Sequence, residues 1–320
     1  MSEFSIRPAV PADAPSVVAL IGSVHPYLVR GEPTTRRMIS DPPPGEDWAA
    51  FVAEERGGPV GWVSTFRNVR SAEPDFGQVS LLSVDPGHRR RGIGDALFAA
   101  AVGHLRARGI RRASATSTPD ALDFARRHGF QPTREIRYSA LDLAGLAHDA
   151  PAVETPAGPE RPAAAGRASV GLPEGVRLVA MGEVGARELF HADTVAATDE
   201  PGDTPQQAVA FETWRYDIWE HPGMDRDAST VAVGETGILA FSLLVRDRER
   251  VWSDMTATVP QWRGRGLARM VKSEALRRAA AAGVTVAYTS NDESNVAMLA
   301  VNDRLGYRPV ATQFSCAGDL

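Results

Sequence analysis

The hydrophobic positions along this chain follow one order of patterns, and they follow it twice. Periods near four residues mark helices, and alternation or short apolar runs mark strands. The first half predicts these elements in order: a helix at 11–29, a hairpin at 48–67, a strand at 78–84, a helix from 93, a strand at 111–117, a helix at 120–128 and a strand at 133–143. The second half predicts the same order: a hairpin at 229–245, a strand at 251–259, a helix at 266–282, a strand at 284–290, a helix at 294–304 and a strand near 308–316.

Strands that alternate with helices, together with hairpins, predict a mixed α/β fold. We expect two tandem domains, each with a mixed, mostly antiparallel central sheet flanked by helices. Residues 144–174 are rich in Ala, Pro and Gly and predict a linker. This places an N-terminal domain at 1–143 and a C-terminal domain at 175–320, which suits a length of 320 residues.

Each half carries the same motif, Arg-x-x-Gly-x-Gly/Ala, where a strand that ends near a proline passes into a helix. The two copies lie 174 positions apart: Arg89, Arg90, Arg91, Gly92, Ile93 and Gly94, then Arg263, Gly264, Arg265, Gly266, Leu267 and Ala268. Glycine lets an anion approach the backbone, a helix start carries partial positive charge, and arginine suits phosphate. One copy alone could be a tight turn with a solvated basic face, but two matched copies favour a pyrophosphate site. The triphosphate and dinucleotide fingerprints are absent, which argues against nucleoside triphosphates and NAD.

These segments resemble a known family. "LLSVDPGHRRRGIGDALF" (81–98) and "TATVPQWRGRGLARMVK" (256–272) are similar to motif A of the GCN5-related N-acetyltransferases (GNAT). "ALDFARRHGFQP" (121–132) and "NDESNVAMLAVNDRLGYRP" (291–309) are similar to the family's closing helix and Gly-aromatic turn. The resemblance implies an enzyme that binds acetyl-CoA as cosubstrate and transfers its acetyl group to an amine.

The resemblance also implies positions for the coenzyme. Besides both loops, the strand positions implied to hold the pantetheine arm are Leu82 and Val84 in the first half, and Thr256, Thr258 and Val259 in the second. Asn295 matches a further family position that contacts the pantetheine side.

The proton chemistry departs from the family pattern. The usual acid is a tyrosine four residues before the closing glycine, where this chain has Ala125 and Asn302. An asparagine can hydrogen-bond a thiolate but cannot act as an acid. Asp254 is a candidate base, because strand alternation places it on one face with Thr256 and Thr258. Asp292 and Glu293 are alternatives, and a purely structural role for Asp254 also stays open.

The segment 197–227 is acidic and aromatic, and in the family the corresponding region lines the acceptor site. We expect these residues to bind an ammonium group: Asp199, Glu200, Asp203, Trp214 and Asp217. The alternative is a solvated acidic loop beside aromatic side chains that pack in the core.

Charge and composition narrow the partners. The net charge is −5, and the acidity lies in the second half, which favours a cationic small molecule over nucleic acid, although it also serves solubility. No apolar run reaches about 18 residues and no signal pattern opens the chain, so we expect no membrane partner and a cytoplasmic location. The single Cys316 is read as a packing residue. No histidines stand in ligand spacing, so we expect no metal. We also expect a monomer or homodimer.

The leading hypothesis is acetyl-CoA-dependent N-acetylation of a primary amine on a small cationic metabolite or antibiotic, with the C-terminal domain as the catalyst. The N-terminal domain, whose loop is the more regular, is the alternative catalyst. A non-catalytic acyl-CoA sensor or scaffold is a second hypothesis. The third is acetylation of a cysteinyl amine, as in the similarly arranged mycothiol synthases.

Overall fold

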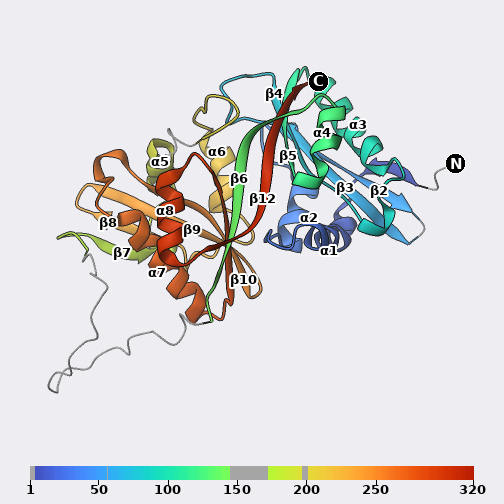
Figure 1. Cartoon of the computed structure of the whole chain (residues 1–320). Coiled ribbons are helices and arrows are strands. Elements are labelled where there is room, and N and C mark those ends of the chain that lie inside the picture. The colour runs from blue at the N-terminus through green and yellow to red at the C-terminus, as the bar shows by residue number, and fades with distance from the viewer. Residues whose placement is uncertain (1–3, 56, 145–171, 197–200) are drawn as a thin grey trace.

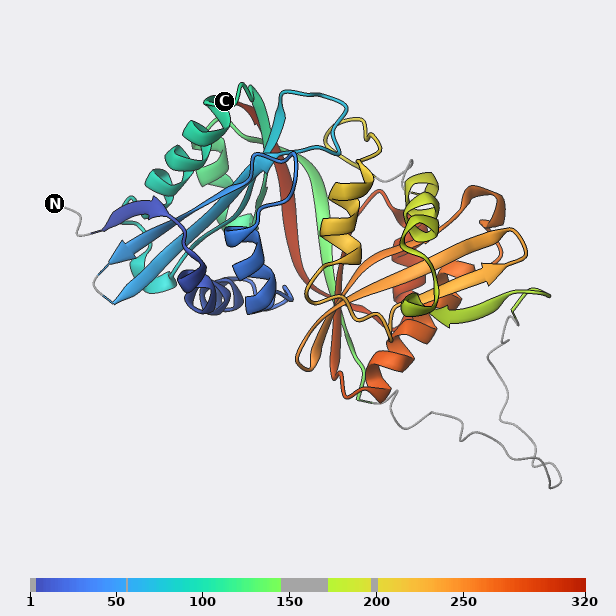
Figure 2. The same cartoon turned by 180° about the vertical axis from the view of Figure 1, so that it is seen from behind.

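The computed structural model of this chain describes residues 4–55, 57–144, 172–196 and 201–320. The strands of these described residues form one continuous twelve-stranded sheet, and helices cover both of its faces (Figures 1 and 2). The predicted mixed α/β architecture of two tandem, similarly built halves is confirmed. Most of the predicted linker at 144–174 lies outside the described residues.

The predicted elements appear in the predicted order in both halves, together with further strands and helices that the sequence did not predict. The first half contains β1 Ser5–Pro8, α1 Ala14–Val24, α2 Glu32–Ser40, β2 Ala49–Glu55, β3 Gly58–Arg67, β4 Phe76–Val84, α3 Ile93–Arg106, β5 Arg112–Ser117, α4 Leu122–Arg127 and β6 Gln131–Asp142. The second half contains β7 Arg177–Ala180, α5 Ala186–Ala196, α6 Phe211–Trp214, β8 Thr230–Gly234, β9 Gly237–Asp247, β10 Arg250–Thr258, α7 Leu267–Ala281, β11 Val286–Asp292, α8 Val296–Leu305 and β12 Arg308–Asp319.

The helix expected over 11–29 is wrong in its extent. Helix α1 ends at Val24, because Pro26 disfavours helical geometry at the residue before it. A second helix, α2, then begins at Glu32. Its sequence is polar and buries only Thr35, so it gave no hydrophobic period from which to predict it.

The two halves exchange their last strands. The sheet order is β1-β2-β3-β4-β5-β12-β6-β11-β10-β9-β8-β7, so β12 pairs with β5 of the first half and β6 pairs with β11 of the second. Figure 1 shows β6 and β12 side by side at the centre of the molecule. The boundaries 1–143 and 175–320 stay a prediction, since each half is completed by a strand from the other.

The cores follow the same exchange. Cys316 of β12 is fully buried in the core of the first half, as expected for a packing residue, while Leu141 and Leu143 at the end of β6 belong to a core of the second half. Arg134 on β6 forms ion pairs with Asp203 at 2.9 Å and Asp292 at 2.7 Å, both from the second half. Apolar burial and ion pairs together fix which strand pairs with which.

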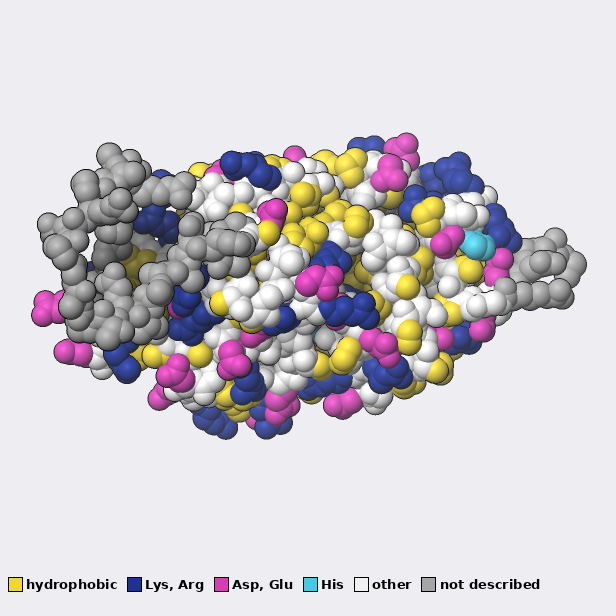
Figure 3. All heavy atoms as spheres, turned by 90° about the horizontal axis from the view of Figure 1, so that it is seen from below, with side chains coloured by type: hydrophobic (Ala, Val, Ile, Leu, Met, Phe, Trp, Pro, Cys, Tyr) yellow, Lys and Arg dark blue, Asp and Glu magenta, His cyan; other side chains and the backbone are white. Residues whose placement is uncertain are grey.

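The surface shows no gathering of one charge on the face drawn in Figure 3, where basic and acidic side chains are interspersed. Among the helices that the structure describes, none is long and apolar enough to cross a membrane.

Candidate functional site

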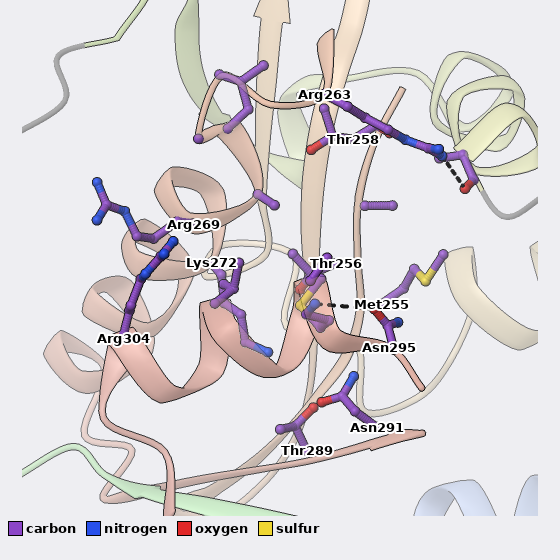
Figure 4. A pocket seen from close by; sticks show the side chains of 18 of the residues that line it. Met255, Thr256, Thr258, Arg263, Arg269, Lys272, Thr289, Asn291, Asn295 and Arg304 are labelled. Atoms are coloured by element: carbon purple, nitrogen blue, oxygen red, sulfur yellow. Dashed lines mark hydrogen bonds between the residues drawn. The ribbon is translucent and has the colours of Figure 1, made fainter. Parts of the chain in front are cut away.

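A cavity of about 850 Å³ lies in the second half, among β10, the start of α7, the end of β11 and α8 (Figure 4). It is created by two strands that diverge. β10 and β11 pair in parallel only over three residues each, where Arg250–Trp252 lies beside Val286–Tyr288. Beyond that point the register of β10 against β9 shifts between Ser253 and Thr256, and residues 254–258 and 289–291 line opposite sides of the cavity.

The start of α7 closes one end of the cavity. Gly266 is its N-cap and has a φ of 79°, in the left-handed region that only glycine adopts without strain. The side chain of Arg263 donates from Nε to the carbonyl of Thr258 at 3.1 Å and so fixes the loop to the preceding strand. The first N–H groups of a helix have no partner within the helix, which makes this end an anion site.

Charge makes the cavity suitable for a phosphate-bearing ligand. Four arginines line it, namely Arg263, Arg265, Arg269 and Arg304, whereas Asp254 is the one acidic residue among the described lining residues. Arginine is the side chain that best matches phosphate geometry. Among the residues that the structure describes, no group of three or more His, Cys, Asp or Glu could hold a metal ion.

Most of the residues predicted for the second half meet at this cavity. They are Asp254, Thr256, Thr258, Arg263, Gly264, Arg265, Gly266, Leu267, Ala268 and Asn295. The Oδ1 atom of Asn295 also caps α8 by accepting from the N–H of Met298 at 3.2 Å. Two predicted residues lie behind the lining. Val259 packs in the core, and Asn302 is buried and donates from Nδ2 to Oδ1 of Asn291, a lining residue, at 2.6 Å.

Three of the predicted acceptor residues are described, and they lie elsewhere in the second half. Asp203 is held by Arg134, and it also accepts from the Ser315 hydroxyl at 2.6 Å. Trp214 is buried and donates from its indole N–H to Asp193 at 2.6 Å. Asp217 lies 3.7 Å from Arg70, and burial raises the pKa of its carboxyl. None of these three lines the cavity described above, and Asp199 and Glu200 lie outside the described residues.

The first half keeps the loop but fills the groove. Gly92 caps α3 with a φ of 85°, and the Arg89 side chain donates to the carbonyl of Val84 at 3.3 Å, as in the second half. A Cβ atom on Gly94 would lie 3.3 Å from the ring of Phe124 and 4.0 Å from Leu82. Phe124 therefore occupies the space beside the helix start.

The remaining loop residues of the first half differ in their surroundings, and Arg90 is exposed. Arg91 pairs with Glu55 at 2.8 Å, Arg90 has a φ of 63° at the position that matches Gly264, and Ile93 is a core residue. The first-half loop is thus built for the same backbone path, with its charge partly neutralised.

Sequence reasoning missed Lys272, which also lines the cavity. It is the only lysine of the chain, it is 1% exposed, and burial lowers its pKa to about 7. Its ammonium nitrogen lies 4.9 Å from the centroid of the Tyr307 ring. The signal for it was available, because adding the offset of 174 places Lys272 opposite Phe98, at an apolar position of the first half.

The chain is similar to known proteins in sequence and in fold. Residues 23–130 match the family model described as Acetyltransferase (GNAT) family. The chain is 27% identical over 262 residues, 80% of its length and 77% of the relative's, to a protein named mycothiol acetyltransferase from Nocardiopsis dassonvillei. A GCN5-related N-acetyltransferase from Sphaerobacter thermophilus has a similar fold, with a TM-score of 0.69, 19% identity and coverage of 100% of this chain and 96% of that one. A tandem GNAT protein from the clavulanic acid biosynthesis pathway also has a similar fold, with a TM-score of 0.69, 20% identity and coverage of 99% of this chain and 98% of that one.

Proposed function

We propose, from the premise that this chain is a GNAT acyltransferase with two tandem domains, that its C-terminal domain carries out acetyl transfer from acetyl-CoA to a primary amine of a small molecule. The observation that carries the proposal is the arginine-lined cavity at the start of α7. We propose the domain boundaries given above, with the N-terminal domain in a supporting role, because Phe124 fills the matching groove.

The cavity fits acetyl-CoA in size and charge. A volume of about 850 Å³ lies within the usual range of ligand sites, about 300–1,000 Å³. We propose that the backbone N–H groups of residues 264–268, with Arg263 and Arg265, hold the pyrophosphate. The main-chain groups of Thr256 and Thr258, at the divergent edge of β10, would hold the arm that leads to the acetyl thioester. Acetyl-CoA supplies the activated acetyl group.

The chain's own groups would handle the acceptor proton. We propose Asp254 as the base, because its exposed side chain lies on the lining segment 254–258, and a carboxylate accepts a proton from an ammonium or from a bridging water. Asn302 is proposed as a positioning residue, since it donates to Asn291 and so holds the orientation of that lining amide.

We also propose the chemical class of the amine that accepts the acetyl group. The acidic second half supports a small cationic metabolite or antibiotic in the cytoplasm, with Asp203, Trp214 and Asp217 shaping the region near the acceptor. The name of the relative from Nocardiopsis dassonvillei supports a second candidate, the amine of a cysteinyl group.

The test is a titration followed by an amine panel. Native mass spectrometry with acetyl-CoA should show one bound molecule per chain. Release of free coenzyme thiol should then depend on the amine, and the panel should contain polyamines, aminoglycosides and cysteinyl glycosides. Binding without turnover on any amine would instead favour a non-catalytic acyl-CoA sensor, for which the absence of the family's tyrosine is the motive. Absence of binding would refute the proposal.

A further inference from the structure

The cavity of the second half contains a buried amine that the roles assigned above leave unused. Lys272 lies six residues beyond Gly266, so it stands about 9 Å along α7 from the proposed phosphate site. Its counterpart in the first half, Phe98, packs against Phe124 and His128, with ring centroids 6.1 and 4.3 Å away. The second half has therefore placed an ionisable group where the first half has an aromatic core residue.

Lys272 faces the inner end of the cavity. In Figure 4 its side chain extends from α7 toward the side where Thr289 and Asn291 lie. Thr289 is the first residue of β11 beyond the last β10–β11 pair, and it donates from its hydroxyl to the carbonyl of Ser253 at 3.0 Å. The amine thus lies near the point where the two strands part, and a ligand arm that runs from the start of α7 along β10 ends there.

Burial destabilises the ammonium form of Lys272, so this side chain releases its proton more readily than an exposed lysine does. The ring of Tyr307 stabilises a cation, but burial has the larger effect and lowers the pKa of Lys272 to about 7. The charged groups that line the same cavity are, from α7, α8, β10 and the loop, Arg269, Arg304, Asp254, Arg263 and Arg265. Four of these five are cationic, and burial is the cause of the lowered pKa of Lys272.

We propose that Lys272 delivers the proton that the departing thiol of coenzyme A requires. The inference rests on the proposed function. The attacking amine forms a C–N bond with the thioester carbonyl carbon, the C–S bond breaks, and its electron pair stays on sulfur. Lys272 Nζ donates a proton to this sulfur and becomes neutral. The attacking nitrogen loses its proton to Asp254 or water, and Lys272 is reprotonated from solvent, so that amine and thioester give amide and thiol. Lys272 thereby takes the role of the family's tyrosine, which neither half has four residues before its closing glycine.

The first test uses the fact that Lys272 is the only lysine. Untagged protein is produced with lysine labelled at the ε-carbon, so NMR shows a single lysine side chain. Its pH titration is recorded with saturating coenzyme A and, separately, with saturating desulfo-coenzyme A. If Nζ contacts the sulfur, the ammonium and the thiolate stabilise each other, and the lysine midpoint should be higher with coenzyme A than with the desulfo analogue by about one pH unit or more. Equal midpoints with both ligands bound would overturn the proposal. Calorimetry on the same samples reports binding, and if neither ligand binds, the proposed function fails as well.

Substitutions give the second test. Lys272→Met removes the amine, and Lys272→Arg keeps a cation whose proton is not released. Both variants should retain acetyl-CoA affinity within a few-fold, while kcat falls about 100-fold or more. Phe98→Met, at the matching position of the first half, is the control and should keep wild-type kcat. A folded Lys272→Met protein with unchanged kcat would contradict the assignment, and thermal unfolding establishes that it is folded.

Discussion

The cleanest test of which half binds acetyl-CoA is a pair of matched substitutions, Gly266→Glu and Gly92→Glu. Both glycines are helix N-caps in the left-handed region, with φ values of 79° and 85°. A Cβ atom at position 266 would have Met270 as its nearest neighbour at 3.9 Å, and one at position 92 would have nothing within 4 Å. Space is therefore not limiting, and each variant should lose about 1–2 kcal/mol of unfolding free energy from backbone strain alone.

The two variants should differ only in binding. A glutamate at position 266 places a negative charge about 5 Å from a bound phosphate, which at an effective dielectric constant near 20 costs about 3 kcal/mol. The dissociation constant for acetyl-CoA should therefore rise about 100-fold or more in Gly266→Glu. In Gly92→Glu it should stay within a few-fold of wild type, because Phe124 already fills that groove.

Isothermal titration calorimetry measures the affinities, and thermal unfolding checks that the two variants are equally strained. Loss of binding in Gly92→Glu together with full binding in Gly266→Glu would refute the assignment of the C-terminal domain. Equal loss in both would mean that the halves act as one site, and the proposed supporting role of the first half would fall.

Three further predictions follow from the same contacts. Val301 stands five residues before the closing Gly306, as Phe124 stands five residues before Gly129, and it lines the cavity. Val301→Phe should therefore abolish acetyl-CoA binding by calorimetry without lowering the melting temperature by more than a few degrees. Arg134→Leu leaves two nearly buried carboxylates unpaired and should cost about 3 kcal/mol at pH 7 in a urea unfolding experiment. Against the raising effect of burial, hydrogen bonds lower the pKa of both carboxyls, chiefly from Arg134 for Asp203, and from Ser294 and then Arg134 for Asp292. The contribution of Arg134 is therefore present above about pH 4 and is lost as the pH falls through these lowered pKa values, where the variant and wild type should converge. Cleavage of the chain within 145–171 should leave two fragments that stay associated on size exclusion, because each completes the sheet of the other; fragments that separate as folded monomers would contradict the strand exchange.

The loop at the start of α7 was predictable because its signal is local. Gly266, Arg263 and the preceding Pro260 specify a backbone path within a few residues, and their spacing is visible in the sequence. The strand exchange was not predictable in this way. β6 and β12 have strand patterns of similar length, and backbone hydrogen bonding does not discriminate between partners, so the choice depends on contacts such as Arg134 with Asp292, which are 158 positions apart.

The role of a charged or aromatic side chain was the least predictable feature. Asp203 and Trp214 have the composition of a cation site, and both have partners within the fold: Arg134 and Ser315 for Asp203, and Asp193 for the buried Trp214. Composition reports which groups are present in a segment, but only the fold decides which carboxylates face a partner and which face solvent. Lys272 is the opposite case. It is a single charged residue at an otherwise apolar helix position, and that pattern in the sequence did indicate a residue that lines the cavity.

The two halves also show that a family signature and a ligand site depend on different residues. The family model matches residues 23–130, in the half whose groove is filled, whereas the cavity described above lies in the other half. The signature is carried by glycines, prolines and core positions that fix the backbone, and both halves retain these. We expect room for a ligand to depend on the side chains at two matched pairs, Phe98 with Lys272 and Phe124 with Val301. The side chains at these pairs can be exchanged in each half alone, with both loops left intact. Phe98→Lys with Phe124→Val should open a second coenzyme site, and Lys272→Phe with Val301→Phe should close the present one. The stoichiometry of acetyl-CoA binding should then be two and zero per chain, and an unchanged value of one in both variants would show that volume at these positions is not sufficient.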